Sequence, residues 1–340
     1  MTKEYSWVIL NRIIFLKDLD QKEWDVQLKK FAELMGVSRA TVSLAMNNSP
    51  NVAAATKKRI QEAARELGYF PSPQGRALRR GRSNMIGCIL PDLNNSFFNI
   101  IFCSISQKCT QMGYALLSMH VNQKADSAPA ITMMLEHGVE GIIFLATPCG
   151  SSWQTLVRQR KVPVVIYNTP SINDFSTVQT DDLIGGEIAM QHLLDNGHRN
   201  ILCSSRQILR LQGNINAGSK CSDTRIIPYN KIHEIADLLK QHPEITAIIA
   251  YSDDEAIDII RLLKKLNIRV PEDISLIGFD NMRYSAWEEF GLTTVAQPQQ
   301  QMGIILSEQL IKHISDDLTA IECIKIIPEL ITRATVKNLQ

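Results

Sequence analysis

The chain has 340 residues, 45% of them hydrophobic, so it is long enough for two or three domains that each bury a sizeable core. Its formal net charge of +1, taken alone, argues against nucleic-acid binding, but the charge is unevenly distributed. Residues 26–83 contain eleven Lys and Arg against three Asp and Glu, a net charge of +8, whereas residues 84–340 contain 21 against 27, a net charge of −6. A basic segment on a mildly acidic body is typical of a DNA-binding domain joined to a separate domain.

Residues 1–25 contain the apolar run SWVILNRIIFL, which Asn11 and Arg12 interrupt. The run is far shorter than the ~20 apolar residues that a membrane span needs, and no small-residue cleavage site follows it. The seven cysteines are scattered and show no CxxC pair, so we expect reduced thiols. The sequence therefore predicts a cytoplasmic protein without a membrane segment. Residues 1–25 are as readily explained by an extension or an upstream start site as by a function.

A helix-turn-helix is predicted within residues 26–70. The first helix would place apolar residues at helical spacing on one face, and Gly36 would end it, because glycine adopts the left-handed conformation that a helix terminus favours. Ser38 can cap the second helix by accepting a hydrogen bond from an unpaired backbone amide. The residues expected to face outward, toward a major groove, are Arg39, Ala40, Ser43, Leu44 and Asn47.

A third helix is predicted over residues 56–67, which completes a compact three-helix head. It is followed by the basic segment 71–83, in which Pro71 and Pro73 forbid a continued helix. We interpret this segment as a linker whose positive charge faces DNA.

From Asn84 onward, short apolar runs such as MIGCIL, GIIFLA and ISLIGFD alternate with helical patterns. This alternation predicts parallel sheets covered by helices on both faces. The segment 84–340 is long for one doubly wound sheet, so we expect it to form two lobes. Small ligands bind beyond the carboxyl ends of such strands, where the sequence places the polar segments PDLNNSF, YNTP, YSDDE and GFDN.

Several segments, in order along the chain, resemble the LacI/GalR family of bacterial transcription regulators. They are VQLKKFAELMGVSRATVSLAMN, ARELGYFPS, ALRRGRSNMIGCILPD, HGVEGIIF, HLLDNGHRNI, VPEDISLIGFDN and LTTVAQPQQQMG. The resemblance implies an all-α helix-turn-helix head at 26–70, a hinge helix at 71–83 and, at 84–340, an α/β two-lobed core like that of periplasmic sugar-binding proteins. It also implies a homodimer. The VSLAMN segment further resembles maltose-regulon repressors.

The DNA-contacting positions of the family carry over to this sequence. The resemblance implies phosphate contacts for Ser38, Thr41, Asn47 and Asn51. It implies base contacts for Arg39, Ala40 and Leu44. Leu44 stands where arginine is common; arginine can bind guanine through two hydrogen bonds, with about 1–3 kcal/mol of discrimination, whereas leucine offers only an apolar contact such as one to a thymine methyl. The alternative is a shifted register in which Leu44 is buried.

In the linker, Leu78 matches the leucine that the family inserts into the minor groove, and Arg76 lies near it. An inserted apolar side chain costs unstacking energy but bends DNA so that more surface is contacted. The alternative is that Leu78 packs on the core. Gly75 stands in place of a usual alanine and weakens a hinge helix by roughly 1 kcal/mol, so we expect the hinge to fold only on DNA.

The effector-binding positions that the resemblance implies mostly follow predicted strands. They are Asn95, Phe97, Asn168, Arg210, Asp253 and Asp280. Alternatively, the aspartates are helix caps or turn formers and Arg210 is a surface residue. Trp287 is interpreted as a core residue in preference to a platform for a sugar ring.

Three departures from the family pattern affect the effector site. Ser252 replaces a usual Asn, and Asn214 replaces the Phe of an R-x-x-G-F motif. In addition, the segment between Gly197 and Leu239 is shorter than the corresponding segment expected for the family. Either the pocket is altered or effector binding has been lost.

Three classes of function can be compared. A DNA-binding regulator needs the basic head and linker, and both are present. A sugar-binding protein of the periplasm would explain residues 84–340 but would need a signal peptide and would leave residues 26–83 without a use. A nucleotide-dependent enzyme would need phosphate-binding chemistry, yet neither GxGxxG nor GxxxxGK[ST] occurs. We therefore predict a repressor of carbohydrate-use genes, controlled by a sugar or sugar phosphate, with no enzymatic activity, cofactor or metal.

Overall fold

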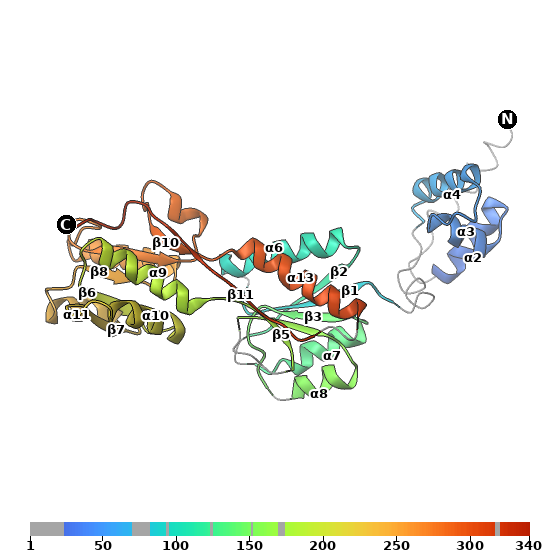
Figure 1. The fold of residues 1–340 in the computed structure, drawn as a ribbon. Helices are drawn as coiled ribbons and strands as arrows, with labels where there is room; N and C mark the ends of the chain where they lie inside the picture. Colours follow the sequence, from blue (N-terminus) through green and yellow to red (C-terminus); the bar gives the residue numbers. More distant parts are fainter. Residues whose placement is uncertain are drawn as a thin grey trace. The chain divides into compact units, whose positions relative to one another are not determined.

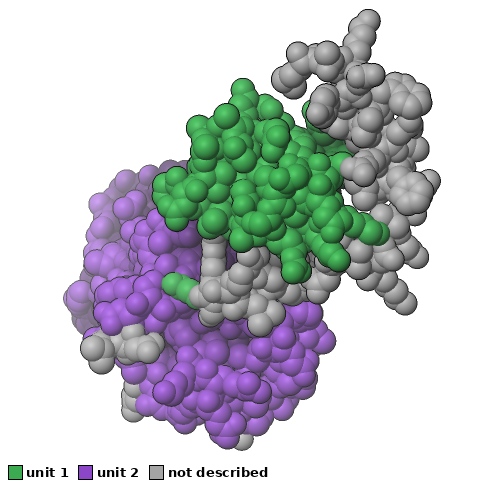
Figure 2. Space-filling model, turned by 90° about the vertical axis from the view of Figure 1, so that its right-hand side faces the viewer, with its two compact units in different colours: residues 1–83 green, residues 84–340 purple. Residues whose placement is uncertain are grey.

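The structure, a computed structural model, describes residues 24–69, 82–92, 95–122, 125–150, 152–168, 174–316 and 320–340. The chain divides into two compact units, Met1–Ser83 and Asn84–Gln340, which Figure 2 shows in different colours. Most of the N-terminal segment 1–25 and of the predicted linker 71–83 lies outside the described residues.

The described part of the first unit contains three helices (Figure 1): α2 (Trp24–Met35), α3 (Arg39–Met46) and α4 (Ala54–Glu66). Gly36 follows α2 with a φ of 65°, a left-handed conformation that glycine adopts without strain. One apolar core joins the helices, and Phe31 stacks on Tyr69 with ring centroids 4.5 Å apart. The other buried members of this core are Ala32, Val42, Ala45, Val52, Ile60 and Ala64.

Helix α4 is bonded to the ends of both preceding helices. Arg59 Nη2 donates to the carbonyl of Met35, the last residue of α2, over 3.1 Å. Gln61 Nε2 donates to the carbonyl of Ala45 over 3.0 Å and to Asn48 Oδ1 over 2.8 Å. The bond to Met35 satisfies a carbonyl group at the C-terminus of α2, and the bond to Ala45 adds a second donor to a carbonyl that also accepts from Asn48 N over 3.2 Å. The core and these bonds together fix which face α3 turns outward.

The second unit contains two six-stranded sheets covered by helices (Figure 1). The first lobe comprises β1 (Met85–Leu90), α6 (Ser96–Gln111), β2 (Ala115–His120), α7 (Ala128–Glu136), β3 (Gly141–Phe144), α8 (Ser152–Gln159), β4 (Val164–Tyr167), β5 (Ser176–Thr180), α13 (Gln299–Ser315) and β11 (Cys323–Ile326). Its strand order is β11-β5-β4-β3-β1-β2, and all neighbours pair in parallel.

The second lobe has the same architecture. It comprises α9 (Asp182–Asp195), β6 (Asn200–Ser204), α10 (Ile208–Gly218), β7 (Arg225–Tyr229), α11 (Ile232–Gln241), β8 (Ala247–Ile249), α12 (Asp253–Lys265), β9 (Ser275–Phe279), the 3-10 helix η1 (Arg283–Ala286), β10 (Thr293–Ala296) and β12 (Glu329–Ile331). Its strand order is β12-β10-β9-β8-β6-β7, in which β12 pairs antiparallel to β10 and the other neighbours pair in parallel.

The chain passes between the lobes three times, after β5, after β10 and after β11. Asp181 N donates to the carbonyl of Ile326 over 2.9 Å, which joins the first passage to the third. Thr180 Oγ1 donates to Gln297 Oε1 over 2.5 Å, which joins the first passage to the second. The three connecting segments are therefore bonded to one another.

Apolar residues fill both faces of each sheet, which explains why the strands are nearly continuous apolar runs. In β1, Ile86 packs with residues of α6 and α13, while Ile89 packs with residues of α7 and α8, because successive strand residues point to opposite faces. Helix α13 approaches α6 closely, since a Cβ added to Gly303 would lie 2.6 Å from the carbonyl oxygen of Ile101. Among the described helices, none combines the length and apolar character needed to cross a bilayer.

Candidate DNA-binding surface and effector site

Helix α3 buries its apolar side and turns a mixed face outward. Val42 and Ala45 lie in the core of the head, whereas Arg39, Ala40 and Leu44 are exposed. Leu44 is 40% exposed, so the alternative register that would bury it does not occur. The outer face thus offers a guanidinium, a small methyl side chain and a large apolar side chain at adjacent positions.

The predicted phosphate-contacting residues lie at the two ends of α3. Ser38 caps the helix: Thr41 N donates to Ser38 Oγ over 3.0 Å, and the two hydroxyl oxygens lie 2.9 Å apart. Asn47, at the other end, is exposed and donates from Nδ2 to the carbonyl of Ser43 over 2.8 Å. Asn51 is exposed in the following turn. Polar groups therefore flank the three positions that are predicted to read bases.

Arg76 and Leu78, the residues predicted to enter the minor groove, lie outside the described residues. The alternative, in which Leu78 packs on the core, therefore also remains untested. Both assignments stay predictions.

In the first lobe, Asn95, Phe97 and Asn168 follow the carboxyl ends of β1 and β4. Asn95 caps α6, its Oδ1 accepting a hydrogen bond from Phe97 N over 2.9 Å. Phe97 is 7% exposed, and its ring centroid lies 6.0 Å from that of Tyr167, the last residue of β4. Asn168 has a φ of 47°. The structure therefore brings the ends of these two strands together, with Asn95 and Phe97 shaping the edge.

Asp253, at the start of α12, is fully buried in the second lobe. Its carboxylate accepts hydrogen bonds from Met282 N over 2.7 Å, Ser285 Oγ over 2.6 Å and Thr294 Oγ1 over 2.6 Å. Burial raises its pKa to about 6, although these bonds lower it. A Cβ added to Gly278 would lie 2.2 Å from Asp253 Oδ1. Asp253 thus joins α12 to the segment after β9 and to β10. It is not the helix cap considered as its alternative, because Ser252 caps α12.

Arg210 on α10 is a nearly buried cation, not the surface residue considered as its alternative. Its Nε donates to Asp182 Oδ1 over 2.7 Å, and its Nη1 donates to the carbonyl of Tyr251 over 2.8 Å. The guanidinium also lies 3.5 Å from the centroid of the Phe279 ring, and only 11% of the side chain is exposed. Gln207 Nε2 donates to the second oxygen of Asp182 over 2.9 Å. The charge of Arg210 is therefore compensated within the lobe.

Asp280 directly follows β9 and has a φ of 115°, which is rare for a residue with a side chain. Its Oδ1 accepts a hydrogen bond from Gln297 Nε2 over 2.6 Å. Gln297 Oε1 in turn accepts from Thr180 and, over 3.5 Å, from the hydroxyl of Tyr167. Burial raises the pKa of Asp280 to about 8, against the influence of Arg210, which lowers it. Asp280 and Arg210 thus belong to one polar cluster at the junction of the lobes.

Four residues that the sequence analysis did not single out organise this region: Asp182, Arg206, Glu255 and Gln297. Glu255 is 5% exposed, accepts a hydrogen bond from the hydroxyl of Tyr229 over 2.7 Å and pairs with Arg206 Nη1 over 2.9 Å. Glu255 lies in the first turn of a helix that follows the apolar strand β8, whereas Asp182 begins the helix after the polar strand β5. Because a buried carboxylate needs a partner, an acidic residue beside an apolar run is a usable signal for Glu255, but the sequence offers no such signal for Asp182.

In the region that is expected to be shorter than in the family, residues 197–239, only two residues, 230–231, connect β7 to α11. It also contains α10, which packs directly on the backbone of α9: a Cβ added to Gly213 would lie 2.0 Å from the carbonyl oxygen of Leu183. Asn214 is 1% exposed, and its Oδ1 has no hydrogen-bond partner within the described part of the chain. Two of the three departures thus lie in and around α10, whereas the third, Ser252, caps α12.

Trp287 is 52% exposed, so the preferred interpretation as a core residue is wrong. Its ring stacks on that of Phe290 with centroids 6.4 Å apart and meets that of Tyr284 edge-on at 6.2 Å. The three rings form an aromatic cluster, partly exposed, in the segment after β9.

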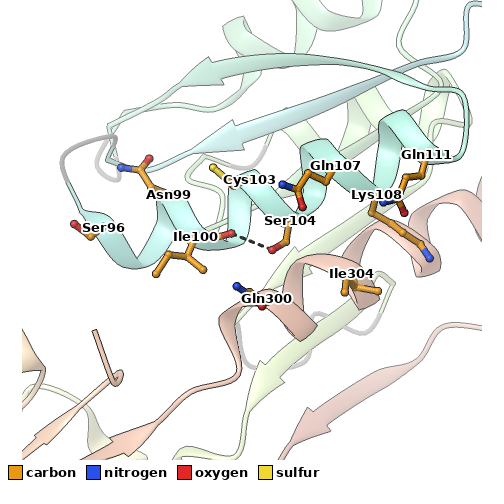
Figure 3. A pocket seen from close by; sticks show the side chains of 10 residues that line it. All are labelled: Ser96, Asn99, Ile100, Cys103, Ser104, Gln107, Lys108, Gln111, Gln300 and Ile304. Atoms are coloured by element: carbon orange, nitrogen blue, oxygen red, sulfur yellow. Dashed lines mark hydrogen bonds between the residues drawn. The ribbon is translucent and has the colours of Figure 1, made fainter. Parts of the chain in front are cut away.

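A groove of about 550 Å³ lies between α6 and α13 in the first lobe (Figure 3). Uncharged polar side chains such as Asn99, Gln107 and Gln300 line much of it, together with Ile100 and Ile304. None of the predicted effector residues lines this groove. It is therefore separate from the polar cluster at the lobe junction.

Comparison with known protein families gives a match for each unit. Residues 27–72 match the family described as "Bacterial regulatory proteins, lacI family". Residues 83–334 match the family described as "Periplasmic binding proteins and sugar binding domain of LacI family". Together the two matches extend over most of the chain.

Two similar proteins carry the name HTH-type transcriptional repressor PurR. The one from Vibrio vulnificus (strain CMCP6) is 28% identical over 340 residues, covering 92% of this chain and 99% of its own length. The one from Aliivibrio salmonicida (strain LFI1238) is 29% identical over 334 residues, with coverage of 92% and 99%.

Solved structures show the same fold. The lac repressor dimer bound to operator and the anti-inducer ONPF has a TM-score of 0.80 at 21% identity, covering 90% of this chain and 98% of that one. The complex of the transcriptional regulator CelR with cellobiose has a TM-score of 0.67 at 23% identity, covering 91% and 99%. The predicted fold class, a helix-turn-helix head with a two-lobed α/β core, is confirmed.

Proposed function

The chain belongs to the LacI family of bacterial regulatory proteins and is a DNA-binding transcriptional regulator, and from this premise we propose that it represses carbohydrate-use genes under control of a small sugar-like effector. The observation that carries the proposal is the exposed face of α3, on which Arg39, Ala40 and Leu44 stand outward from a well-packed head. The similar proteins are named as repressors, which supports a binding role without catalysis. A cytoplasmic location follows from the proposed role.

We propose that two copies of the chain bind one operator. The lac repressor structure with the same fold is a dimer bound to operator, which supports this assembly. Two heads related by a two-fold axis would read two half-sites of a pseudo-palindrome.

Within each head, α3 and the residues at its ends would make two kinds of contact with DNA, one with phosphate groups and one with bases. Ser38, Thr41, Asn47 and Asn51 hold phosphate groups and set the register of the helix on DNA. Arg39, Ala40 and Leu44 face base edges in the major groove, and Arg76 and Leu78 of the linker act at the minor groove. Arginine at position 39 is the residue suited to a guanine contact.

The effector would bind at the carboxyl ends of the strands, in contact with the six predicted residues Asn95, Phe97, Asn168, Arg210, Asp253 and Asp280. A regulator of the same fold with altered or lost effector binding is the second candidate. The compensated charge of Arg210 and the complete burial of Asp253 favour this candidate, because both groups are engaged in bonds within the protein. A sugar-binding protein that does not bind DNA would leave the outward face of α3 without a role.

The test is a protection footprint on the DNA upstream of the chain's own gene, repeated with a panel of sugars and sugar phosphates. Affinity for the protected site is then measured at several salt concentrations. Each phosphate contact makes the slope of log affinity against log salt concentration more negative by roughly 0.9, so we expect the affinity to fall steeply as salt is added. Salt-independent binding would contradict the DNA-binding role. A footprint that no member of the panel changes would favour the second candidate.

A further inference from the structure

Arg206 lies in the connection between β6 and α10, at the carboxyl edge of the second-lobe sheet. Its Nη1 donates to Glu255 Oε2 over 2.9 Å, and its guanidinium lies 4.1 Å from the centroid of the Tyr251 ring. The side chain of Arg206 is 46% exposed, whereas that of Glu255 is 3% exposed. Arg206 is thus held on one side by two contacts and is open to solvent on the other.

The bond to Glu255 leaves most of the guanidinium available. Glu255 also accepts hydrogen bonds from the hydroxyl of Tyr229 over 2.7 Å and from Tyr251 N over 3.1 Å, so its position does not depend on Arg206 alone. A guanidinium has five N–H donors, and within the described part of the chain the bond to Glu255 uses one of them. The planar arrangement of the other donors matches the oxygens of a carboxylate or a phosphate.

The neighbouring charged groups are engaged with other partners. Arg210 pairs with Asp182 and is 11% exposed, so its charge is hardly available to a ligand. Asp280 accepts a hydrogen bond from Gln297, and Asp254 accepts one from Tyr284. Arg206 therefore presents an exposed positive charge at this edge.

Two further features of this edge suit an organic anion. Helix α10 begins two residues after Arg206, and the partial positive charge of a helix N-terminus favours a negative group nearby. Ile208 and Leu209, the first residues of α10, are 77% and 51% exposed and provide apolar surface beside the charge. The edge lies at the carboxyl ends of parallel strands, where open α/β sheets bind ligands.

We propose that Arg206 binds an anionic group of the effector, so that the effector is a sugar phosphate or a sugar acid and not a neutral sugar. The proposal rests on the effector control proposed above, and it chooses between the two ligand classes that the sequence left open. Arg206 is a residue of the binding site in this proposal, and Glu255 and Tyr251 position it.

The test compares Glu255→Gln with the double variant Arg206→Gln/Glu255→Gln. Removing Arg206 alone would leave a buried carboxylate without a positive partner and destabilise the lobe, whereas glutamine at position 255 is neutral and keeps an acceptor for Tyr229. Binding of inorganic phosphate, glucose 6-phosphate, gluconate and glucose is measured by calorimetry at constant ionic strength. Glucose 6-phosphate and gluconate distinguish a phosphate group from a carboxylate.

We expect the wild-type protein to bind at least one anionic probe more tightly than glucose. Glu255→Gln should bind that probe at least as tightly, because Arg206 no longer has a competing carboxylate. The double variant should bind it about tenfold or more weakly, as expected for the loss of charge-assisted hydrogen bonds. Arg225→Gln is the matched control, since Arg225 is 54% exposed and also pairs with a glutamate, Glu244, over 2.8 Å; it should leave the affinity unchanged.

Equal affinities for the wild-type protein and the double variant would overturn the proposal, as would an equal loss in Arg225→Gln or no response of the wild-type protein to any anionic probe. The measurement uses no DNA, so its outcome is separate from that of the footprint. A protein that binds phosphate through Arg206 but binds no operator would contradict the proposed regulatory function alone.

Discussion

At the residue scale, Leu44 is the most informative side chain of the head. Its exposure on α3, together with that of Arg39, shows that an apolar side chain stands among the residues proposed to read bases. An apolar contact distinguishes thymine by its methyl group, whereas an arginine distinguishes guanine by two acceptors. The operator of this protein should therefore carry an A·T pair at the position that Leu44 faces.

Replacing Leu44 by arginine should change the preferred base pair at one position of each half-site from A·T to G·C. The expected change in discrimination is about 1–3 kcal/mol, the value of a bidentate contact to guanine. Competition binding on operators with single substitutions measures it. Leu44→Ala serves as the control and should weaken binding without creating a preference for guanine. An effect of Leu44→Arg that is equal on every operator would show that position 44 faces no base.

Two aspartates of the second lobe, the buried Asp253 and the half-buried Asp280, make its stability depend on pH. Burial raises the pKa to about 8 for Asp280 and to about 6 for Asp253, above the value of about 3.9 in an unfolded chain. The folded state then binds protons more tightly, so the free energy of unfolding should fall as the pH rises from about 4 to about 8. Asp280→Asn should remove the fall between about pH 6 and 8 and keep the part due to Asp253 below pH 6. Urea unfolding across this range measures it, and an unchanged profile in the variant would contradict the assignment.

At the element scale, the contact between α9 and α10 is the tightest constraint near the proposed effector site. A Cβ added to Gly186 would lie 2.1 Å from the carbonyl oxygen of Arg210, and one added to Gly213 would lie 2.0 Å from that of Leu183. Both contacts are with backbone atoms, which cannot move without shifting a helix. The position of Arg210 over Phe279 therefore depends on these two glycines.

Gly213→Ala should destabilise the second lobe by about 1–3 kcal/mol or more, because the added methyl group overpacks the helix pair. Gly218→Ala, in the same helix, is the matched control: its Cβ would meet side-chain atoms and no backbone, Cδ1 of the flexible Ile226 side chain at 2.7 Å and Cγ2 of Thr224 at 3.3 Å. The better helix propensity of alanine, about 1 kcal/mol, should offset much of that smaller clash. Thermal unfolding of both variants gives the comparison. Equal losses of stability would show that the backbone contact is not the cause.

At the scale of the whole molecule, local patterns predicted the head and most strands, but not the elements that complete the sheets. The polar run STVQT of β5 did not read as a strand, because its buried hydroxyl groups look like loop residues in the sequence. Strand β11 pairs with β5, from which it is separated in the sequence by the whole second lobe, so a local pattern could not predict this pairing. Likewise, the sequence indicated Arg210, but its pairing with Asp182 depends on how α9 and α10 pack.

The C-terminal edge strands belong to different lobes although few residues separate them. Ile324 of β11 lies opposite Val178 of β5, and Leu330 of β12 lies opposite Val295 of β10. Because proline removes a backbone donor, Ile324→Pro should raise amide hydrogen exchange in β5, and Leu330→Pro should raise it in β10. Exchange measured by mass spectrometry distinguishes the two. Increased exchange in the same lobe for both variants would contradict the strand pairing.

The threefold passage of the chain between the lobes has a consequence for synthesis on the ribosome. Met302, Leu306 and Leu310 of α13 are fully buried against the first lobe, yet they are translated only after nearly all of the second lobe. Until they emerge, Ile101 and Ile105 of α6 lack their apolar neighbours on the nascent chain. At about 5–20 residues per second, this interval lasts on the order of ten seconds. The growing protein therefore exposes this apolar surface for longer than a chain whose domains follow one another in order.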